Sequence, residues 1–82
     1  MLSMEKQEVC ERVIALIESK VYSDKGISLN DDLRDELGLD SLDIFELMCD
    51  CEEDFKIALP EDTYDVRTVQ NLTDIVFKKI QG

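Results

Sequence analysis

The sequence predicts an all-α fold, a small four-helix bundle with three longer helices and one short helix. Two observations support this prediction. Apolar residues recur three or four positions apart in separate stretches, and no stretch alternates apolar and polar residues as a strand does. Because 82 residues are enough for one small domain, we expect residues 1–82 to form a single domain.

The first helix is predicted at about residues 3–20. Ser3 is the expected N-cap, and Lys20 suits the last turn, where a positive charge stabilises the negative end of the helix dipole. The buried side is expected to consist of Val9, Cys10, Val13, Ile14, Leu16 and Ile17, which follow helical spacing.

A long loop is predicted between the first two helices, because Ser23-Asp24-Lys25-Gly26 breaks the helical pattern. We expect the irregularly spaced apolar residues of this loop to hold it against the core: Ile27, Leu29, Leu33, Leu37 and Leu39.

The second helix is predicted at residues 41–55, with Asp40 as its N-cap. At about 100° per residue, its side chains fall into three strips. The core-facing strip consists of Ile44, Leu47, Met48, Cys51 and Phe55. The acidic strip consists of Asp43, Glu46, Asp50, Glu53 and Asp54, and the exposed apolar strip of Leu42, Phe45 and Cys49. Like charges at helical spacing destabilise a helix, so these two exposed strips favour a surface that binds a partner protein.

Two further helices are predicted after Pro60. The proline favours the first position of a short helix at about residues 61–66. The last helix is predicted at about residues 68–80, with Thr68 as its N-cap and Lys78 and Lys79 near its negative end. Its buried stripe is expected to consist of Val69, Leu72, Ile75, Val76 and Ile80.

The charge is concentrated in the middle of the chain. The formal net charge is −11, and residues 31–65 hold 14 of the 20 acidic residues but only two of the nine basic ones. Such a field repels nucleic acid and anionic membranes and attracts basic protein surfaces. No apolar stretch approaches the length of a membrane span, so we expect no membrane insertion, and we expect a monomer.

The three cysteines, Cys10, Cys49 and Cys51, are an odd number without disulfide spacing, which favours a reducing compartment. Cys49 and Cys51 diverge on a helix and so cannot bind one metal ion together. The first residues show no signal peptide pattern. We therefore expect a cytoplasmic protein without a metal site.

Ser41 is placed where the second helix begins. A serine nucleophile needs a general base, but the chain contains no histidine and no lysine is predicted beside Ser41. Asp40 and Asp43 would repel a reversibly bound phosphate. The residues alone leave two interpretations open, a structural serine and a covalently modified one; neither makes the protein an enzyme.

An ordered set of motifs surrounds Ser41. Leu37-Gly38-Leu39-Asp40-Ser41-Leu42 matches a Leu-Gly-x-Asp-Ser-Leu pattern that is followed by Glu46-Leu47. Glu52-Glu53-Asp54-Phe55, Ile57-Ala58-Leu59-Pro60 and Thr68-Val69 continue the pattern. In this set, which covers roughly residues 29–80, the chain resembles the acyl carrier protein family.

The resemblance implies a 4′-phosphopantetheine arm on Ser41, transferred from coenzyme A by a phosphopantetheinyl transferase. The arm would carry acyl groups as thioesters to acyl-transferring, condensing and modifying enzymes of fatty acid or polyketide-type biosynthesis. It also implies that these enzymes meet the carrier through basic patches. The matching recognition positions are Asp40, Leu42, Asp43, Phe45, Glu46, Cys49, Glu52 and Glu53.

Several alternatives remain. An aminoacyl or peptidyl carrier more often has Gly-Gly before the serine, where this chain has Leu39-Asp40. A calcium-binding loop is disfavoured because the EF-hand ligand register is missing. An unmodified acidic helical adaptor stays open. Asp50, Cys49 and Cys51 depart from the usual carrier pattern, and they leave open whether the pathway is fatty acid synthesis or a specialised one.

Overall fold

The computed structural model describes residues 5–21, 26–60 and 65–81. These ranges contain three helices, α1 (Lys6–Glu18), α2 (Ser41–Phe55) and α3 (Val69–Gln81). They contain no strand, only an isolated bridge between Asp32 and Thr68. The predicted all-α class is therefore confirmed.

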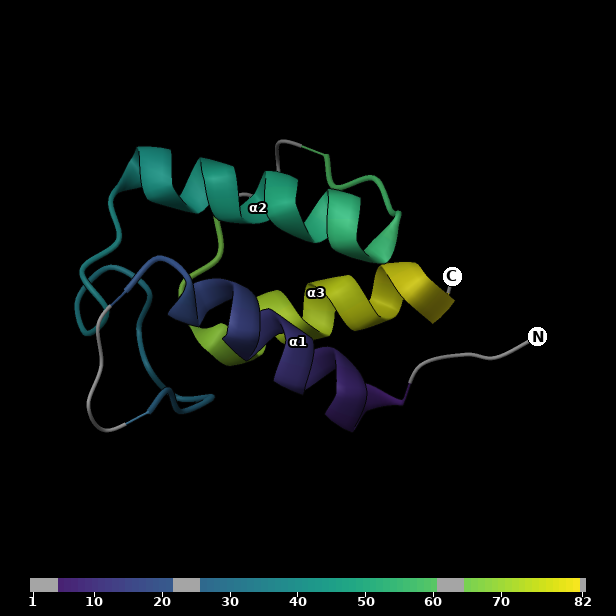
Figure 1. The fold of residues 1–82 in the computed structure, drawn as a ribbon, viewed down its shortest axis with the longest axis horizontal. Helices are drawn as coiled ribbons and strands as arrows, with labels where there is room; N and C mark the ends of the chain where they lie inside the picture. The colour runs from purple at the N-terminus through teal and green to yellow at the C-terminus, as the bar shows by residue number, and fades with distance from the viewer. Residues whose placement is uncertain (1–4, 22–25, 61–64, 82) are drawn as a thin grey trace.

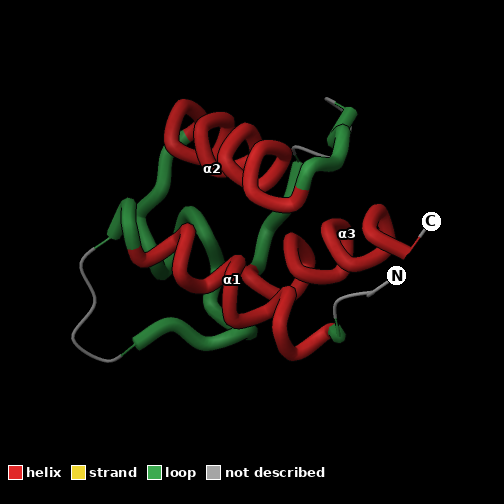
Figure 2. The backbone as a smooth tube through the Cα atoms, turned by 45° about the vertical axis from the view of Figure 1, so that its right-hand side comes forward, coloured by secondary structure: helices red, strands yellow, loops and turns green. Residues whose placement is uncertain are grey.

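The helices form two layers. α1 and α3 pack side by side, and α2 forms a second layer over them (Figures 1 and 2). Residues 26–40 lead into α2 at one end of the bundle (Figure 1). None of the described helices is long and apolar enough to span a membrane.

The core is almost entirely aliphatic and draws on every described element. Each helix buries the residues of one side, and four loop residues complete the core, namely Leu33, Leu39, Leu59 and Val66. The helical contributions are Val9, Val13 and Ile17 from α1, Ile44, Leu47, Met48 and Cys51 from α2, and Val69, Leu72 and Val76 from α3. The core strip predicted for α2 is confirmed, with Phe55 half-buried at its end.

α2 begins at Ser41, as predicted. Asp40 and Asp43 form a capping box that determines this start. Asp43 N donates to Asp40 Oδ1 at 2.8 Å, and Asp40 N donates to Asp43 Oδ2 at 3.3 Å. The helix ends at Phe55 and is followed by the C-cap Lys56, which takes a left-handed conformation with φ 57°.

The last helix also begins where the sequence predicts. Asn71 N donates to Thr68 Oγ1 at 3.1 Å, and Thr68 N donates to Asn71 Oδ1 at 3.3 Å. These two bonds satisfy amides that the first turn of α3 leaves unpaired. Lys78 and Lys79 lie in the last turn, as predicted.

The predicted bounds of the first helix are wrong at both ends. α1 begins at Lys6 after Glu5, whose backbone is extended, whereas Ser3 lies outside the described residues. α1 ends at Glu18, and Ser19 Oγ donates to the Leu16 carbonyl at 2.6 Å. The amide of Lys20 donates to the Ile17 carbonyl at 2.9 Å, in a tighter turn that leaves Lys20 beyond the helix.

The short helix predicted at 61–66 is not confirmed. Residues 61–64 lie outside the described residues, and Asp65 and Val66 are not helical. Val66 is only 4% exposed, so it anchors the segment before α3 by burying its side chain.

Candidate functional site

Ser41 is the first residue of α2 and is exposed at the end of the bundle where the loop meets this helix (Figure 1). The capping box fixes where α2 starts and therefore fixes Ser41 in its first turn. Its hydroxyl oxygen accepts a hydrogen bond from Arg34 Nη1 at 3.3 Å. The serine thus lies between the acidic cap and one guanidinium group.

The turn that carries Arg34 is organised by Asp32. Asp32 Oδ1 accepts from Asp35 N at 2.8 Å and from Arg34 N at 2.9 Å. These bonds, first from Asp35 and then from Arg34, lower the pKa of Asp32, and the nearby Arg67 and Arg34 charges act in the same direction. The carboxylate therefore stays ionised and holds both amides.

Gly38 closes the same turn. Its φ of 73° lies in the left-handed region, and a Cβ built there would meet nothing within 4 Å. Backbone conformation, not lack of space, therefore favours glycine at this position. Gly38 N donates to the Arg34 carbonyl at 3.1 Å. This bond closes the turn on Arg34, the residue whose side chain contacts Ser41.

This turn is tied to the segment before α3 and to the start of that helix. Leu33 is fully buried, and its amide donates to the Arg67 carbonyl at 2.7 Å. Val69 N donates to the Asp31 carbonyl at 3.1 Å. The position of the turn that carries Arg34 is thus set by hydrogen bonds between residues that are far apart in the sequence.

Five residues form the outer face of α2, directed away from the core: Leu42, Phe45, Glu46, Cys49 and Glu53. Leu42 is 64% exposed and Phe45 is 49% exposed, although both are large and apolar. Glu46 and Glu53 are exposed between and beside them, and Cys49 is half-buried. The structure brings these predicted recognition residues together on one surface that begins at Ser41.

The three other predicted recognition acids make bonds within the chain. Asp40 and Asp43 form the capping box. Glu52 Oε2 accepts from Leu59 N at 2.8 Å and holds the segment that follows α2. Their carboxylates therefore have structural roles besides any contact with a partner.

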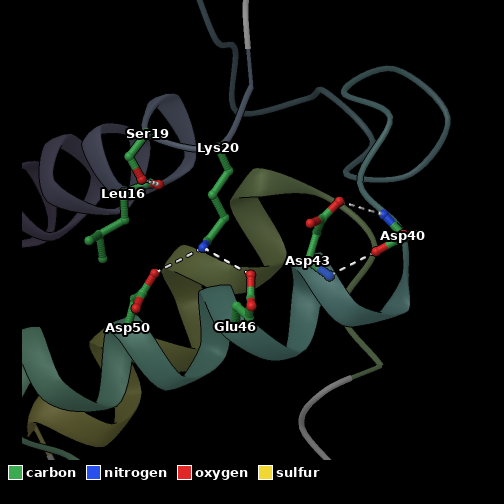
Figure 3. A network of polar contacts seen from close by, with 7 residues as sticks. All are labelled: Leu16, Ser19, Lys20, Asp40, Asp43, Glu46 and Asp50. Carbon is green, nitrogen blue, oxygen red and sulfur yellow. Dashed lines mark hydrogen bonds and ion pairs between the residues drawn. The ribbon is translucent and has the colours of Figure 1, made fainter.

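One edge of the acidic strip faces α1 and is neutralised there (Figure 3). Lys20 Nζ lies 3.2 Å from Asp50 Oδ2 and 3.8 Å from Glu46 Oε1, and its side chain is only 16% exposed. Arg12 Nη2 lies 2.7 Å from Asp54 Oδ2, and its guanidinium lies 5.2 Å from the centre of the Phe55 ring. Asp50 and Asp54, two of the five residues of the acidic strip, are therefore paired within the chain.

The sequence carries a signal for these pairs that the apolar periodicity of each helix does not reveal. Arg12 and Lys20, which lies just beyond the end of α1, are eight residues apart, and Glu46 and Asp54 of α2 have the same spacing. The two rows match when the helices run in opposite directions. Only the placement of α1 against α2 decides that they meet.

The Ser41 site does not favour nucleophilic catalysis. Arg34 cannot act as the base, because its guanidinium stays protonated. Among the described residues there is no cluster of three or more potential metal ligands. The Ser41 hydroxyl lies beside the positive charge of Arg34. This arrangement favours the covalent attachment of a negatively charged group to Oγ.

Of the three thiols, Cys51 is the most enclosed. Burial, followed by the charges of Asp50, Asp54 and Glu52, raises its pKa to about 12. Cys10 and Cys49 are half-buried. Cys51 is therefore a packing residue and stays a neutral thiol.

Comparison with known proteins gives the same region a chemical description. Residues 11–76 match the family model described as a phosphopantetheine attachment site. This range contains Ser41, Arg34 and the whole of α2.

Curated relatives match along most of the chain. The acyl carrier protein of Chlorobium phaeobacteroides is 36% identical over 78 residues, which cover 93% of this chain and 100% of the relative. The acyl carrier protein of Guillardia theta is 32% identical over 79 residues, covering 94% and 98%. The mitochondrial acyl carrier protein of Saccharomyces cerevisiae is 35% identical over 80 residues, covering 90% and 64%.

A solved structure shows the same arrangement of the chain. The crystal structure of the acyl carrier protein from Thermotoga maritima superposes with a TM-score of 0.79 at 26% sequence identity. The match covers 95% of this chain and 93% of that one.

Proposed function

The chain belongs to the acyl carrier protein family, and we propose that Ser41 is the residue that bears its 4′-phosphopantetheine group. As a member of this family the protein carries acyl groups and is not an enzyme. Its cofactor is covalently attached 4′-phosphopantetheine, whose terminal thiol supplies the thioester chemistry.

The observation that carries the assignment is the position of the Ser41 hydroxyl. It is exposed at the first turn of α2, inside the range that matches a phosphopantetheine attachment site. A transferase must reach this oxygen with a bulky donor, and an exposed helix start allows that approach. The buried core behind α2 keeps the helix in place while it does so.

Loading would proceed by transfer from coenzyme A. A bond forms between Ser41 Oγ and the phosphorus next to pantetheine, the pyrophosphate bond of coenzyme A breaks, and adenosine 3′,5′-bisphosphate leaves. The hydroxyl proton would pass to a base of the transferase, because Arg34, which is hydrogen-bonded to Oγ, is a donor without acceptor capacity.

The outer face of α2 is the proposed docking surface for the transferase and for acyl-transferring, condensing and modifying enzymes. Glu46 and Glu53 would attract basic patches, and Leu42 and Phe45 would make the apolar contact. Individually exposed ion pairs contribute little affinity, which suits a carrier that must leave each enzyme.

The remaining expectations extend this proposal. We place the protein, as one domain over residues 1–82 and as a monomer, in fatty acid or polyketide-type biosynthesis in the cytoplasm. The relatives are acyl carrier proteins, so neither an aminoacyl carrier nor an unmodified adaptor is favoured.

Intact mass spectrometry tests the attachment residue. The purified protein is incubated with coenzyme A and a broad-specificity phosphopantetheinyl transferase. We expect the wild type to gain the mass of one phosphopantetheine and Ser41→Ala to gain none while keeping its helical circular dichroism. Ser19→Ala removes another exposed serine and should load like the wild type.

An unchanged wild-type mass, with a transferase that loads a known carrier in parallel, would exclude modification at Ser41. Loading of Ser41→Ala would place the arm on another residue.

A further inference from the structure

We propose that Arg34 is a phosphate-binding residue, whose guanidinium pairs with the phosphodiester that joins the pantetheine arm to Ser41. This inference rests on the attachment proposed above. It gives a chemical role to a side chain that neither the serine motif nor the acidic strip explains.

The first support is distance. Arg34 Nη1 already lies 3.3 Å from Ser41 Oγ, the oxygen that would become part of the phosphodiester. The phosphorus would be bonded directly to this oxygen, so its two non-bridging oxygens, which share one negative charge, would lie next to the same guanidinium. A small rotation of the arginine side chain exchanges the hydroxyl for one of them. Guanidinium and phosphate groups form short, charge-assisted hydrogen bonds.

The second support is that the backbone of Arg34 is held in place. Asp32 Oδ1 accepts its amide at 2.9 Å, and its carbonyl accepts from Gly38 N at 3.1 Å. The neighbouring Leu33 is fully buried. Because the turn is fixed on both sides, only the side chain of Arg34 has to be ordered on binding, and its backbone loses no further freedom.

The third support is the charge around the attachment point. A helix N-terminus offers free amides to an anion, but one of those at the start of α2, Asp43 N, already donates to Asp40 Oδ1 at 2.8 Å. The diester would also add a negative charge beside Asp40 and Asp43. Arg34 supplies the opposite charge at the oxygen where it is needed.

Arg34 also lies near carboxylates of its own chain. A polar hollow of about 300 Å³ is lined by Asp32, Arg34, Asp35, Asp65, Val66 and Arg67. The ion pairs found within residues 5–21, 26–60 and 65–81 nevertheless involve Lys6, Arg12 and Lys20, not Arg34. A phosphate fixed to Ser41 is held beside Arg34 by its covalent bond, which gives it the advantage over these exposed carboxylates.

Nuclear magnetic resonance of the arginine side chains tests the pairing in the intact protein. The chain has three arginines, Arg12, Arg34 and Arg67, so a ¹⁵N-labelled sample gives three Nε–Hε signals. Arg34→Gln and Arg34→Lys identify the Arg34 signal in the unloaded protein. Loading with coenzyme A and the transferase should shift this signal and slow its hydrogen exchange with water.

Arg12 and Arg67 are internal controls, since Arg12 pairs with Asp54 and Arg67 lines the polar hollow. Their signals should stay in place. An unchanged Arg34 signal in a sample that intact mass shows to be fully loaded would overturn the role of Arg34 but not the attachment. A sample that does not load at all would overturn the attachment and this pairing with it.

Thermal unfolding gives a second measurement. Loading should lower the melting temperature of Arg34→Gln by about 2–4 °C more than that of the wild type, because the added charge then has no counter-charge. Arg67→Gln removes the same charge from the same hollow and should respond to loading like the wild type. Equal responses of all three proteins would contradict the pairing.

Discussion

Two exposed groups and one buried group define the chemistry of this carrier at the residue scale. Ser41 offers the hydroxyl for the arm, and Arg34 lies 3.3 Å from it. Cys51, in the same helix, lies in the core and has its pKa raised to about 12. The arm's thiol therefore has no reactive competitor at Cys51.

Cys51 should be unreactive in the folded protein. At pH 8 we expect a thiol reagent such as iodoacetamide to modify Cys10 and Cys49 first and Cys51 only after unfolding in urea. Peptide mapping after timed quenching measures this order. Modification of Cys51 at the rate of Cys49 in the native protein would contradict its burial.

The same thiol should make stability depend on alkaline pH. The unfolded state ionises near the ordinary pKa of 9.0, whereas the folded state keeps its proton until about pH 12. Stability is therefore lost as pH rises through this window. The urea unfolding free energy of the wild type should fall more steeply between pH 8 and pH 10.5, both chosen assay values, than that of Cys51→Ala.

The single residues also show what sequence reasoning could reach. The start of α2 at Ser41 and its cap Asp40 were predicted correctly, because capping depends on residues a few positions apart. Arg34 was missed as a neighbour of Ser41. The chain between them passes through the left-handed Gly38, so neither helical nor strand periodicity brings the two together.

At the scale of elements, α2 has two different acidic edges. Asp54 pairs with Arg12 of α1, and Asp50 pairs with Lys20 just beyond the end of α1; these pairs connect the two layers of the fold. Glu53 lies on the outer face with Leu42 and Phe45. Glu46 lies between the two edges, exposed on the outer face but 3.8 Å from Lys20 Nζ.

This division determines which charge reversal tests docking. Glu53→Lys should lower kcat/KM of the transferase by roughly threefold to tenfold at low salt, because it weakens electrostatic steering. The defect should shrink at high salt, where exposed charges are screened. Steady-state kinetics of the unloaded variants at two salt concentrations measure both effects.

Glu8→Lys makes the same change of charge on α1 and is the matched control. It should leave kcat/KM near the wild-type value. Glu46→Lys is a poorer probe, since it would also place a like charge beside Lys20. Equal defects in Glu53→Lys and Glu8→Lys would show that only net charge matters and would contradict docking on the outer face.

Element bounds were predictable where local signals determine them. α2 and α3 begin after capping residues whose bonds lie within one turn, and both were predicted correctly. α1 has no side-chain cap bond at Glu5, and its last turn tightens so that Lys20 can reach α2. That end depends on tertiary contacts, which helical periodicity does not contain.

For the whole molecule, the bundle separates stability from function. The aliphatic core and the ion pairs of Arg12 and Lys20 hold α2 on one side, and Figure 3 shows the pairs that Lys20 makes. Ser41 and the outer face are exposed. The sequence predicted the all-α class and the concentration of charge. It did not predict the layer arrangement, because three amphipathic helices can pack in more than one way.

The central claim is that this chain carries an acyl group on an arm attached at Ser41. The most direct measurement is tandem mass spectrometry of the protein after incubation with acetyl-coenzyme A and the transferase. We expect one acetyl-phosphopantetheine per chain, fragment ions that place it on Ser41, and loss of the acetyl group with neutral hydroxylamine. An unmodified peptide containing Ser41, or fragment ions that place the added mass on any other residue, would contradict the claim.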